Sequence, residues 1–302
     1  MNSEIPLLSI CIPTYNRADV LDETLKSLFK NPDFDENKIE VVVSDNCSTD
    51  NTYQIVLKYP FVRYYRNQEN IRDRNFSKVL SYANGHYIRL FNDTLSFKTG
   101  SLRKMMDIIE THLGEDCNLF FYRVGYINHP CKVVTTTKTS FIKNVSIYVT
   151  SIANFGVWKK DFDLIIDKDR RSELQFVQVD WSFRLVENNK KTIIYMDDYF
   201  EIATLNKKGG YNLFNVFVNH YLYLFKIEQF SLIVYETEKF RLCRYFIYSW
   251  LQILIVDKND NFDFQTEGVY KILFKRYWYE PYFYPMLILI WIKKILRGLN
   301  RC

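Results

Sequence analysis

Polar residues suited to nucleotide binding follow two apolar runs near the start of the chain. Ser44, Asp45 and Asn46 come directly after the run 39–43. The run 7–12 is followed by Pro13, Thr14, Tyr15, Asn16 and Arg17. A carboxylate accepts a hydrogen bond from the imide N–H of uracil or from a ribose hydroxyl. A ligand that lacks this donor binds more weakly, because it leaves the buried carboxylate unpaired. We therefore expect Asp45 to bind a nucleotide; the alternative is that Asp45 caps the following helix.

Two later segments repeat the pattern of an apolar run followed by polar residues. A polar loop follows the run 61–66 and contains Asn70, Asp73 and Asn75. The run 86–91 is followed by Asn92, Asp93 and Thr94. Continuous apolar runs bounded by turn formers indicate strands that are buried in a parallel sheet. Each polar segment is therefore expected at the carboxyl end of a strand.

The segments between these strands have apolar residues at helical spacing, which predicts an α/β fold. Residues 20–28 and 102–109 show this spacing most clearly. Right-handed crossovers make the strands parallel, and ligands bind beyond the carboxyl ends of such strands. We therefore expect the polar segments to meet at one site. No Gly-x-Gly-x-x-Gly follows the first strand, which argues against a dehydrogenase.

Composition restricts the class of protein. With 302 residues and 48% apolar content, the chain can bury the core of one large or two modest domains. The formal charge of +5 is mild, and no nucleic-acid partner is expected. The six cysteines occur singly, without a Cys-x-x-Cys pair, as expected for reduced thiols in a cytosolic protein. The first apolar run begins almost at once, so we expect no signal peptide.

Three ordered segments resemble the family 2 glycosyltransferases of the GT-A fold. They are residues 9–17, 41–52 and 67–76. Within that family the chain is similar to bacterial enzymes that build the O-antigen of lipopolysaccharide and capsular polysaccharides, abequosyltransferase-like members included. The resemblance implies a Rossmann-like, mainly parallel sheet flanked by helices. It covers the first third of the chain strongly and the stretch to Asp198 more weakly.

The resemblance also implies roles for the polar segments. The loop 13–17 would hold the base and ribose of a sugar nucleotide together with Asp45 and Asn46. A segment beside the donor is matched by Asn70, Asp73 and Asn75. Asn75 falls one residue early in this match, and the expected glycine is Arg72. The Arg72 guanidinium could contact a phosphate or be a solvated loop charge.

Asn92 and Asp93 occupy the position of the family's Asp-x-Asp signature. The carboxylates of that signature hold a divalent cation, Mg²⁺ or Mn²⁺, which bridges the diphosphate of the donor. Only one carboxylate, Asp93, is present here. We therefore expect a weaker dependence on the cation than in members with the full signature. The alternative is that these residues form an ordinary turn after a strand.

Asp180 matches, by resemblance, the general base of the inverting members. Such a base removes the proton from the acceptor hydroxyl as that hydroxyl attacks the donor sugar. Asp180 lies in a helical-looking segment, 174–186. The alternative is a carboxylate that favours the start of a helix through the helix dipole. The stretch 152–160 resembles the lining of an acceptor pocket, but such a stretch is more often plain core.

The character of the sequence changes after about residue 205, so we expect two domains, 1–205 and 206–302. The second domain is expected to be helical and rich in aromatic residues. Its last apolar run is shorter than the roughly twenty residues that span a bilayer. Basic residues beside that run favour a helix that lies on an anionic membrane surface. They are Lys293, Lys294, Arg297 and Arg301. The alternative is a helical subdomain whose last helix packs as core.

Together these features predict an enzyme that transfers a sugar, with inversion, from a nucleoside-diphosphate sugar to a lipid-linked glycan. A UDP-sugar is the first candidate donor, and O-antigen or capsule synthesis is the expected setting. The expected location is cytoplasmic, peripheral on the inner face of the cytoplasmic membrane. The incomplete Asp-x-Asp signature supports a second hypothesis, a catalytically degenerate GT-A-like scaffold in a polysaccharide assembly complex.

Overall fold

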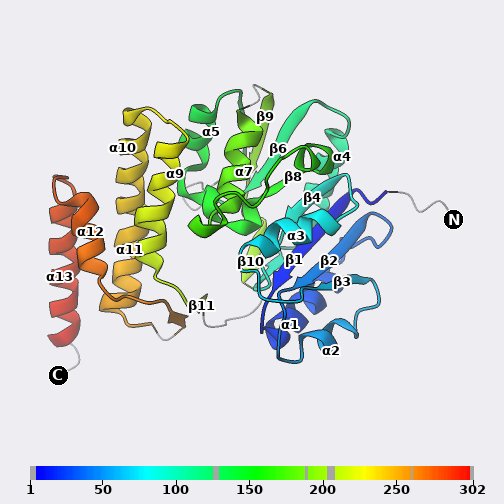
Figure 1. Cartoon of the computed structure of the whole chain (residues 1–302), viewed down its shortest axis with the longest axis horizontal. Helices are drawn as coiled ribbons and strands as arrows, with labels where there is room; N and C mark the ends of the chain where they lie inside the picture. The colour runs from blue at the N-terminus through cyan, green and yellow to red at the C-terminus, as the bar shows by residue number, and fades with distance from the viewer. Residues whose placement is uncertain (1–4, 125–128, 188–189, 203–207, 260, 300–302) are drawn as a thin grey trace. The chain divides into compact units, whose positions relative to one another are not determined.

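The computed structural model describes residues 5–124, 129–187, 190–202, 208–259 and 261–299 (Figure 1). The chain divides into two compact units, Met1–Leu205 and Asn206–Cys302. Each unit has its own buried apolar residues.

The first unit is built on a five-stranded sheet. In spatial order its strands are β3 (Val62–Arg66), β2 (Ile39–Asp45), β1 (Leu8–Thr14), β4 (Tyr87–Leu90) and β8 (Gly156–Trp158). The first four are parallel, and β8 runs antiparallel to β4. Every residue of β2 is buried, as the continuous apolar run predicts. The mainly parallel sheet expected from the sequence is therefore confirmed.

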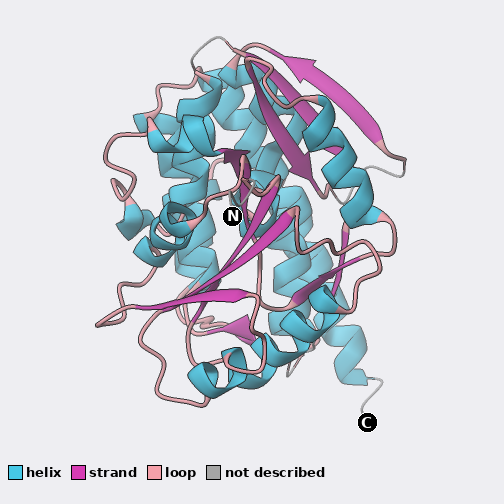
Figure 2. Cartoon of the chain, turned by 90° about the vertical axis from the view of Figure 1, so that its right-hand side faces the viewer, coloured by secondary structure: helices cyan, strands magenta, loops and turns pink. Residues whose placement is uncertain are grey.

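Helices cover both faces of this sheet. They are α1 (Ala18–Phe29), α2 (Thr52–Val56), α3 (Arg74–Tyr82) and α4 (Ser101–Thr111). Leu21 and Leu25 of α1 join a core cluster with Val41 of β2. Val42, the next residue of β2, points to the opposite face, because successive side chains alternate along a strand. On that face α3 packs against β1 and β2. Figure 2 shows the strands in magenta among the helices.

A second sheet in the same unit consists of β6 (Cys117–Tyr122), β9 (Lys191–Met196) and β7 (Cys131–Thr135), in that order. The strand β6 thus belongs to a separate sheet and does not extend the first one. Two buried hydrogen bonds connect it to the first sheet: Tyr87 Oη donates to the carbonyl of Leu119 at 2.8 Å, and Trp158 Nε1 donates to that of Cys117 at 2.9 Å.

Shorter elements complete the first unit. A two-stranded antiparallel ribbon pairs β5 (Leu95–Phe97) with β10 (Phe200–Ile202). Three helices lie between the strands of the second half: α5 (Lys138–Val145), α6 (Lys159–Asp163) and α7 (Val177–Val186). Helix α7 is buried over nearly its whole length and carries Asp180.

The second unit is helical and rich in aromatic pairs, as predicted. Its α-helices are α8 (Leu213–Asn215), α9 (Leu222–Ile227), α10 (Leu232–Arg241), α11 (Tyr248–Leu251), α12 (Val269–Tyr277) and α13 (Phe283–Leu299). Wider, π-helical turns occupy Val216–Tyr221, Leu242–Ile247 and Gln252–Val256, and β11 (Lys208–Gly209) pairs with β12 (Phe262–Asp263). Within the described residues, every helix is too short or too polar to cross a membrane.

Candidate functional site

A polar cleft of about 380 Å³ lies at the carboxyl ends of β1, β2 and β4. Its lining residues are Pro13, Thr14, Tyr15, Arg17, Asn46, Asn70, Arg72, Asp73, Asn75, Phe76, Asn92, Asp93 and Ile152. The fold therefore brings together all of the residues predicted to hold the donor except Asn16 and Asp45. Asn16 lies in the loop after β1, and Asp45 is the last residue of β2.

Asp45 is almost fully buried, and both of its carboxylate oxygens accept hydrogen bonds from the protein. The backbone N–H of Ser48 donates to Oδ1 at 2.8 Å, and Tyr64 Oη donates to Oδ2 at 2.6 Å. Burial and the bond to Asp45 together raise the pKa of Tyr64. Arg66 Nε lies 3.7 Å from the same Oδ2. A nucleotide donor group would therefore have to share or replace the bond from Tyr64.

Asn16 ties the first polar loop to the loop that follows β2. Its Oδ1 accepts a hydrogen bond from the backbone N–H of Thr49 at 2.7 Å, and its own N–H donates to Ser48 Oγ at 2.8 Å. Its φ of 50° is in the left-handed region, which asparagine tolerates better than most residues. In this structure Asn16 fixes the shape of the loop rather than lining the cleft.

A network of asparagines holds the loop that follows β3. Asn46 Nδ2 donates to Asn70 Oδ1 at 2.8 Å, and Asn46 Oδ1 accepts from the backbone N–H of Ile71 at 2.9 Å. Asn75 is buried and exchanges hydrogen bonds with the backbone and side chain of Ser44. Asn67 Nδ2 also donates to Asn75 Oδ1, at 2.8 Å. The sequence interpretation missed Asn67 and Ser44, although both stand at strand ends.

Arg72 and Asp73 are the charged residues of this loop that line the cleft. The φ of Arg72 is 53°, so the position keeps the left-handed backbone that the glycine of the family pattern adopts readily. Burial raises the pKa of Asp73 to about 6, and the nearby Arg72 opposes the rise. Within the described part of the chain, neither side chain forms a hydrogen bond or an ion pair. Both charges therefore remain available to a ligand in the cleft.

Asp93 is buried at the floor of the cleft and forms an ion pair with Arg17. Arg17 Nη1 lies 2.9 Å from Asp93 Oδ1, and about a third of the Arg17 side chain is exposed. Asn92 Oδ1 instead accepts hydrogen bonds from the N–H and Oγ1 of Thr94, which gives the turn after β4 its shape. Asp93 and Asp73 are the carboxylates that line the cleft in the described residues.

These residues fit a divalent cation only when a diphosphate supplies further ligands. Mg²⁺ and Mn²⁺ prefer oxygen, and Mg²⁺ is usually held by one or two carboxylates together with substrate phosphates. Asp93 offers such a carboxylate, but Arg17 already occupies one of its oxygens. The donor set therefore suits a cation that arrives with the nucleotide.

Asp180 lies outside the cleft, fully buried among three arginines. Arg170 binds both of its oxygens at 2.9–3.1 Å, Arg171 Nη1 lies 2.9 Å from Oδ1, and Arg184 Nη1 lies 3.6 Å from Oδ2. We call these residues the arginine cluster. A base in this position must first lose at least one of these partners before an acceptor hydroxyl can reach it. The sequence interpretation did not identify the arginines.

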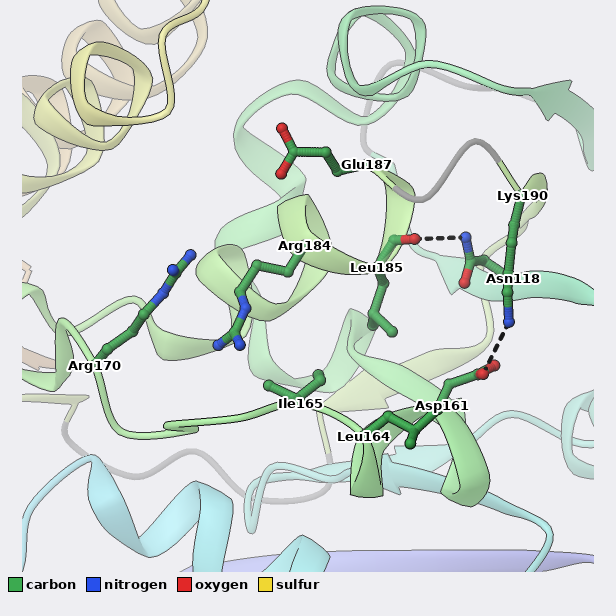
Figure 3. A pocket seen from close by; sticks show the side chains of 9 residues that line it. All are labelled: Asn118, Asp161, Leu164, Ile165, Arg170, Arg184, Leu185, Glu187 and Lys190. Carbon is green, nitrogen blue, oxygen red and sulfur yellow. Dashed lines mark hydrogen bonds and ion pairs between the residues drawn. The ribbon is translucent and has the colours of Figure 1, made fainter.

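A second pocket, of about 410 Å³, adjoins the arginine cluster (Figure 3). Arg170 and Arg184 line one side of it, and the ion pair between Lys190 and Asp161, at 3.0 Å, lines another. Asn118 Nδ2 donates to the carbonyl of Leu185 at 3.0 Å behind this pair. The cationic side chains of this second pocket are thus paired with carboxylates of the protein, whereas Arg72 in the cleft is not, among the described residues.

Comparison with known proteins places the cleft within a region shared with a family of glycosyltransferases. A model described as glycosyl transferase family 2 matches residues 9–162, about half of the chain. This range contains every residue that lines the cleft but ends before Asp180.

Abequosyltransferase RfbV of Salmonella typhimurium is 36% identical over 121 residues, which are 38% of this chain and 34% of that protein. The GalNAc(5)-diNAcBac-PP-undecaprenol beta-1,3-glucosyltransferase of Campylobacter jejuni is 31% identical over 108 residues, or 34% of each chain. The matched region spans about a third of the length of these relatives.

Solved structures share the fold. TarS of Staphylococcus aureus, residues 1–349, superposes with a TM-score of 0.54 and 18% identity over 82% of this chain and 78% of that one. The mannosyltransferase PcManGT from Pyrobaculum calidifontis, in complex with GDP-Man and Mn²⁺, gives a TM-score of 0.53 and 13% identity over 96% of this chain and 87% of that one. The GT-A fold predicted from the sequence is thereby confirmed.

Proposed function

The chain belongs to glycosyl transferase family 2, and from this premise we propose that it transfers a sugar from a nucleoside-diphosphate donor to a lipid-linked glycan of the bacterial surface. A UDP-sugar is the first candidate donor, and O-antigen or capsule synthesis is the proposed setting. The relatives that support this setting are RfbV, an abequosyltransferase, and the Campylobacter enzyme, whose name specifies an undecaprenol-linked glycan.

The observation that carries the proposal is the polar cleft at the strand ends. Its loops are held by protein hydrogen bonds, whereas Arg72 and Asp73 form none with their side chains in the described residues. A sugar nucleotide offers groups that complement both: its diphosphate is anionic, and its sugar and ribose hydroxyls donate hydrogen bonds. Asp45, beside the cleft, would receive a donor group of the base or ribose.

Thermal unfolding in the presence of sugar nucleotides tests the donor. A ligand that binds only the folded chain raises the melting temperature by mass action. UDP-, GDP-, CDP- and dTDP-sugars would be compared at equal concentration, and we expect one nucleotide class to give the largest shift. An equal response to all four would contradict recognition of the base by Asp45.

A divalent cation is part of the proposal, with Asp93 as its protein ligand. When bound, the cation neutralises negative charge on the leaving nucleoside diphosphate. Because the cleft offers few carboxylates, we expect Mg²⁺ and Mn²⁺ to bind appreciably only with the donor present. Titration of the chelated protein with Mn²⁺, with and without the nucleotide, measures this. Tight stoichiometric Mn²⁺ binding without nucleotide would mean that further ligands exist.

Asp180 is the proposed general base of a single displacement. The acceptor oxygen forms a bond to C1 of the donor sugar, the bond from C1 to the phosphate oxygen breaks, and the acceptor proton passes to a carboxylate. Attack from the face opposite the leaving group inverts the configuration. For Asp180 to act as the base, Arg170 or Arg171 must move away from its carboxylate. The proposal therefore requires the loop that contains Arg170 and Arg171 to change conformation when the acceptor binds.

The arginine cluster also supports the second candidate function, a non-catalytic scaffold that binds sugar nucleotides. A carboxylate that is permanently paired would leave the fold and the cleft intact without supplying a base. The two functions differ in one measurement. Donor binding without transfer or hydrolysis by the purified full-length chain would favour the scaffold, and turnover would favour the enzyme.

The exposed face of α13 supports peripheral membrane association. Phe283, Met286 and Ile290 are buried, whereas the opposite face exposes apolar side chains at helical spacing. They include Ile288, Trp291, Ile292 and Ile295. Exposed apolar residues next to basic ones are typical of helices that lie in a membrane interface. Lys294 is exposed, whereas Lys293 donates to Gln252 and Arg297 pairs with Asp257. We therefore expect the exposed apolar side chains of α13 to contribute more to membrane binding than its basic residues do.

Substitution on the exposed face tests this association without removing the buried one. Ile288→Glu with Trp291→Glu should lower the fraction of protein bound to anionic vesicles by about tenfold, because two apolar side chains no longer enter the interface. Leu232→Glu, also exposed but on α10, serves as the matched control. Equal vesicle binding by all three proteins would assign α13 to another role.

A further inference from the structure

Three side chains that commonly bind metals meet where α4 ends and β6 begins. They are His112, Glu115 and Cys117, whose ligand atoms all lie within 4.8 Å of one another. The backbone N–H of Glu115 donates to the carbonyl of His112 at 3.1 Å, which folds the intervening turn tightly. The first parallel strands end at the cleft, and α4 runs back from that edge, so this turn lies at the opposite edge of the α/β unit. Its side chains are absent from the cleft lining.

Both ring nitrogens of the buried His112 imidazole lie close to a polar group of the protein. His112 is buried, and its Nε2 lies 3.1 Å from Tyr195 Oη. Its Nδ1 is also buried and lies 3.1 Å from Glu115 Oε1, a contact that is an ion pair when the imidazole is protonated but that lacks the geometry of a hydrogen bond. When the imidazole is neutral and its Nε2–H points at Tyr195, the Nδ1 lone pair faces this carboxylate with no proton between them, an arrangement that a bound cation would relieve.

We propose that His112, Glu115 and Cys117 form a binding site for Zn²⁺. Imidazole nitrogen, thiolate sulfur and carboxylate oxygen are the three ligand types that zinc uses in proteins. In the tautomer whose Nε2–H donates to Tyr195 Oη, the Nδ1 lone pair of His112 can bind the ion. An outer hydrogen-bond partner that orients a ligating histidine in this way strengthens metal sites. Sulfur and nitrogen ligands disfavour Mg²⁺ and Mn²⁺, so this site is distinct from the proposed cation at Asp93.

The geometry requires a small movement of one ligand. Zinc bonds of about 2.0–2.3 Å place ligand atoms closer together than the widest separation here. Glu115 is exposed and can adjust to the ion, whereas His112 and Cys117 are buried. Lys191 Nζ lies 3.9 Å from Glu115 Oε2, and its charge opposes that of the cation. The Cys117 thiolate and the Glu115 carboxylate supply the negative charge that offsets it, and a water molecule would complete four-coordination. A bound ion would cross-link the end of α4 to the start of β6.

Titration of the reduced, chelated full-length protein with Co²⁺ and Zn²⁺ tests the site. Co²⁺ bound to a thiolate gives a charge-transfer absorption band, so we expect one equivalent of Co²⁺ to produce this band and Zn²⁺ to displace it. Cys117→Ser should abolish the band, and Glu115→Gln should weaken the binding at least about tenfold. Tyr195→Phe, which keeps the ring but removes the hydroxyl, should weaken it by about tenfold to a hundredfold. Cys131→Ser, which alters an exposed cysteine, is the control and should change nothing.

Three results would overturn the site: absence of the band in the wild-type protein, its persistence in Cys117→Ser, or its loss in Cys131→Ser. Circular dichroism of each variant establishes that it is folded. If Cys117→Ser does not fold, the surface variant Glu115→Gln decides the question, because unchanged affinity there contradicts a three-ligand site. The readout does not involve the donor cleft, so it is independent of glycosyl transfer.

Discussion

The cleft and the arginine cluster both contain carboxylates predicted to act on substrates, but they hold them in opposite ways. In the cleft, Asp73 is withdrawn from water without a partner, and its pKa rises to about 6. In the arginine cluster, Asp180 is more deeply buried but surrounded by three guanidinium groups. The burial of a carboxylate alone thus says little about whether it is available to a substrate. What matters is whether the protein or a ligand supplies the counter-charge.

The largest expected effect is that of Asp180→Asn. If Asp180 is the base, turnover should fall by about a hundredfold to ten-thousandfold, while donor affinity stays within a few fold. The substitution also leaves the buried arginines without their counter-charge, which typically costs about 3–5 kcal/mol of stability. Turnover per folded molecule must therefore be measured, with the folded fraction taken from urea unfolding. Anomeric configuration of the product is determined by NMR.

A purely structural Asp180 gives a different pattern. The melting temperature would fall, but turnover per folded molecule would remain near the wild-type value. Arg184→Gln is the matched variant, because it removes the most distant cation, at 3.6 Å, and leaves Arg170 and Arg171 in place. Retained anomeric configuration would rule out the single displacement, whichever residue acts as the base.

The second prediction concerns Asp73 and the dependence of stability on pH. The unfolded carboxyl ionises near 3.8 and the folded one near 6, so between these values the folded chain holds a proton that the unfolded chain has released. The wild type should therefore lose stability as pH rises from about 4 to about 6, by at most about 3 kcal/mol. Asp73→Asn should remove this loss and be more stable than wild type above pH 6.

Urea unfolding at several pH values measures the effect on both proteins. Asp107→Asn, which alters an exposed acid of α4, is the control and should follow the wild-type profile. If wild type and Asp73→Asn have parallel profiles between pH 4 and pH 6, Asp73 already has a partner in solution, and the contrast with Asp180 disappears.

The sequence predicted the cleft better than the arginine cluster for a physical reason. Buried strands leave a local signal, because continuous apolar runs end in polar residues at one edge of the sheet, and Asp45, Asn70 and Asp93 were found in this way. The partners of Asp180 leave no such signal. Arg170 and Arg171 lie in an irregular loop, and the φ of Arg171 is 69°, which no periodic pattern reveals.

The second sheet illustrates the same limit. Strands β6 and β9 are apolar runs that can be recognised locally, whereas β7 is not, and β6 pairs with β9, about seventy residues later in the chain, and not with β4. Only the folded chain specifies such a partner. The hydrogen bond from Tyr64 to Asp45 is similar, since it joins neighbouring strands whose register the sequence does not state.

The third prediction tests whether Asp45 belongs with Asp73 as an available group or with Asp180 as a committed one. Asp45→Ala should weaken nucleotide binding by about 1–3 kcal/mol if its carboxylate accepts a ligand hydrogen bond. Because the change also leaves the N–H of Ser48 and Tyr64 Oη unpaired, calorimetry must be accompanied by a stability measurement.

Tyr64→Phe separates the two roles of Asp45. It frees Oδ2 of Asp45 without altering the carboxylate. If the nucleotide competes with Tyr64 for that oxygen, Tyr64→Phe should preserve or increase nucleotide affinity. If Asp45 is purely structural, neither variant should change the affinity of the folded protein, and both should only lower its stability.

The smallest expected effect is at Arg72, the exposed cation of the cleft. If its guanidinium contacts the diphosphate, Arg72→Gln should weaken donor binding by about threefold to tenfold, because a solvent-exposed ion pair contributes little. The difference from wild type should shrink as salt is added, since ions screen exposed charges. Arg74→Gln changes a neighbouring exposed arginine outside the cleft lining and is the matched control.

Arg72→Gly distinguishes the charge from the backbone. Glycine adopts a φ of 53° without strain, so this variant should fold as well as wild type while losing the same donor affinity as Arg72→Gln. Equal loss in the two variants assigns the effect to the guanidinium. If neither variant differs from Arg74→Gln, Arg72 is a solvated loop charge. An unpaired cation in the cleft would then indicate a binding site no better than the paired cations around Asp180 do.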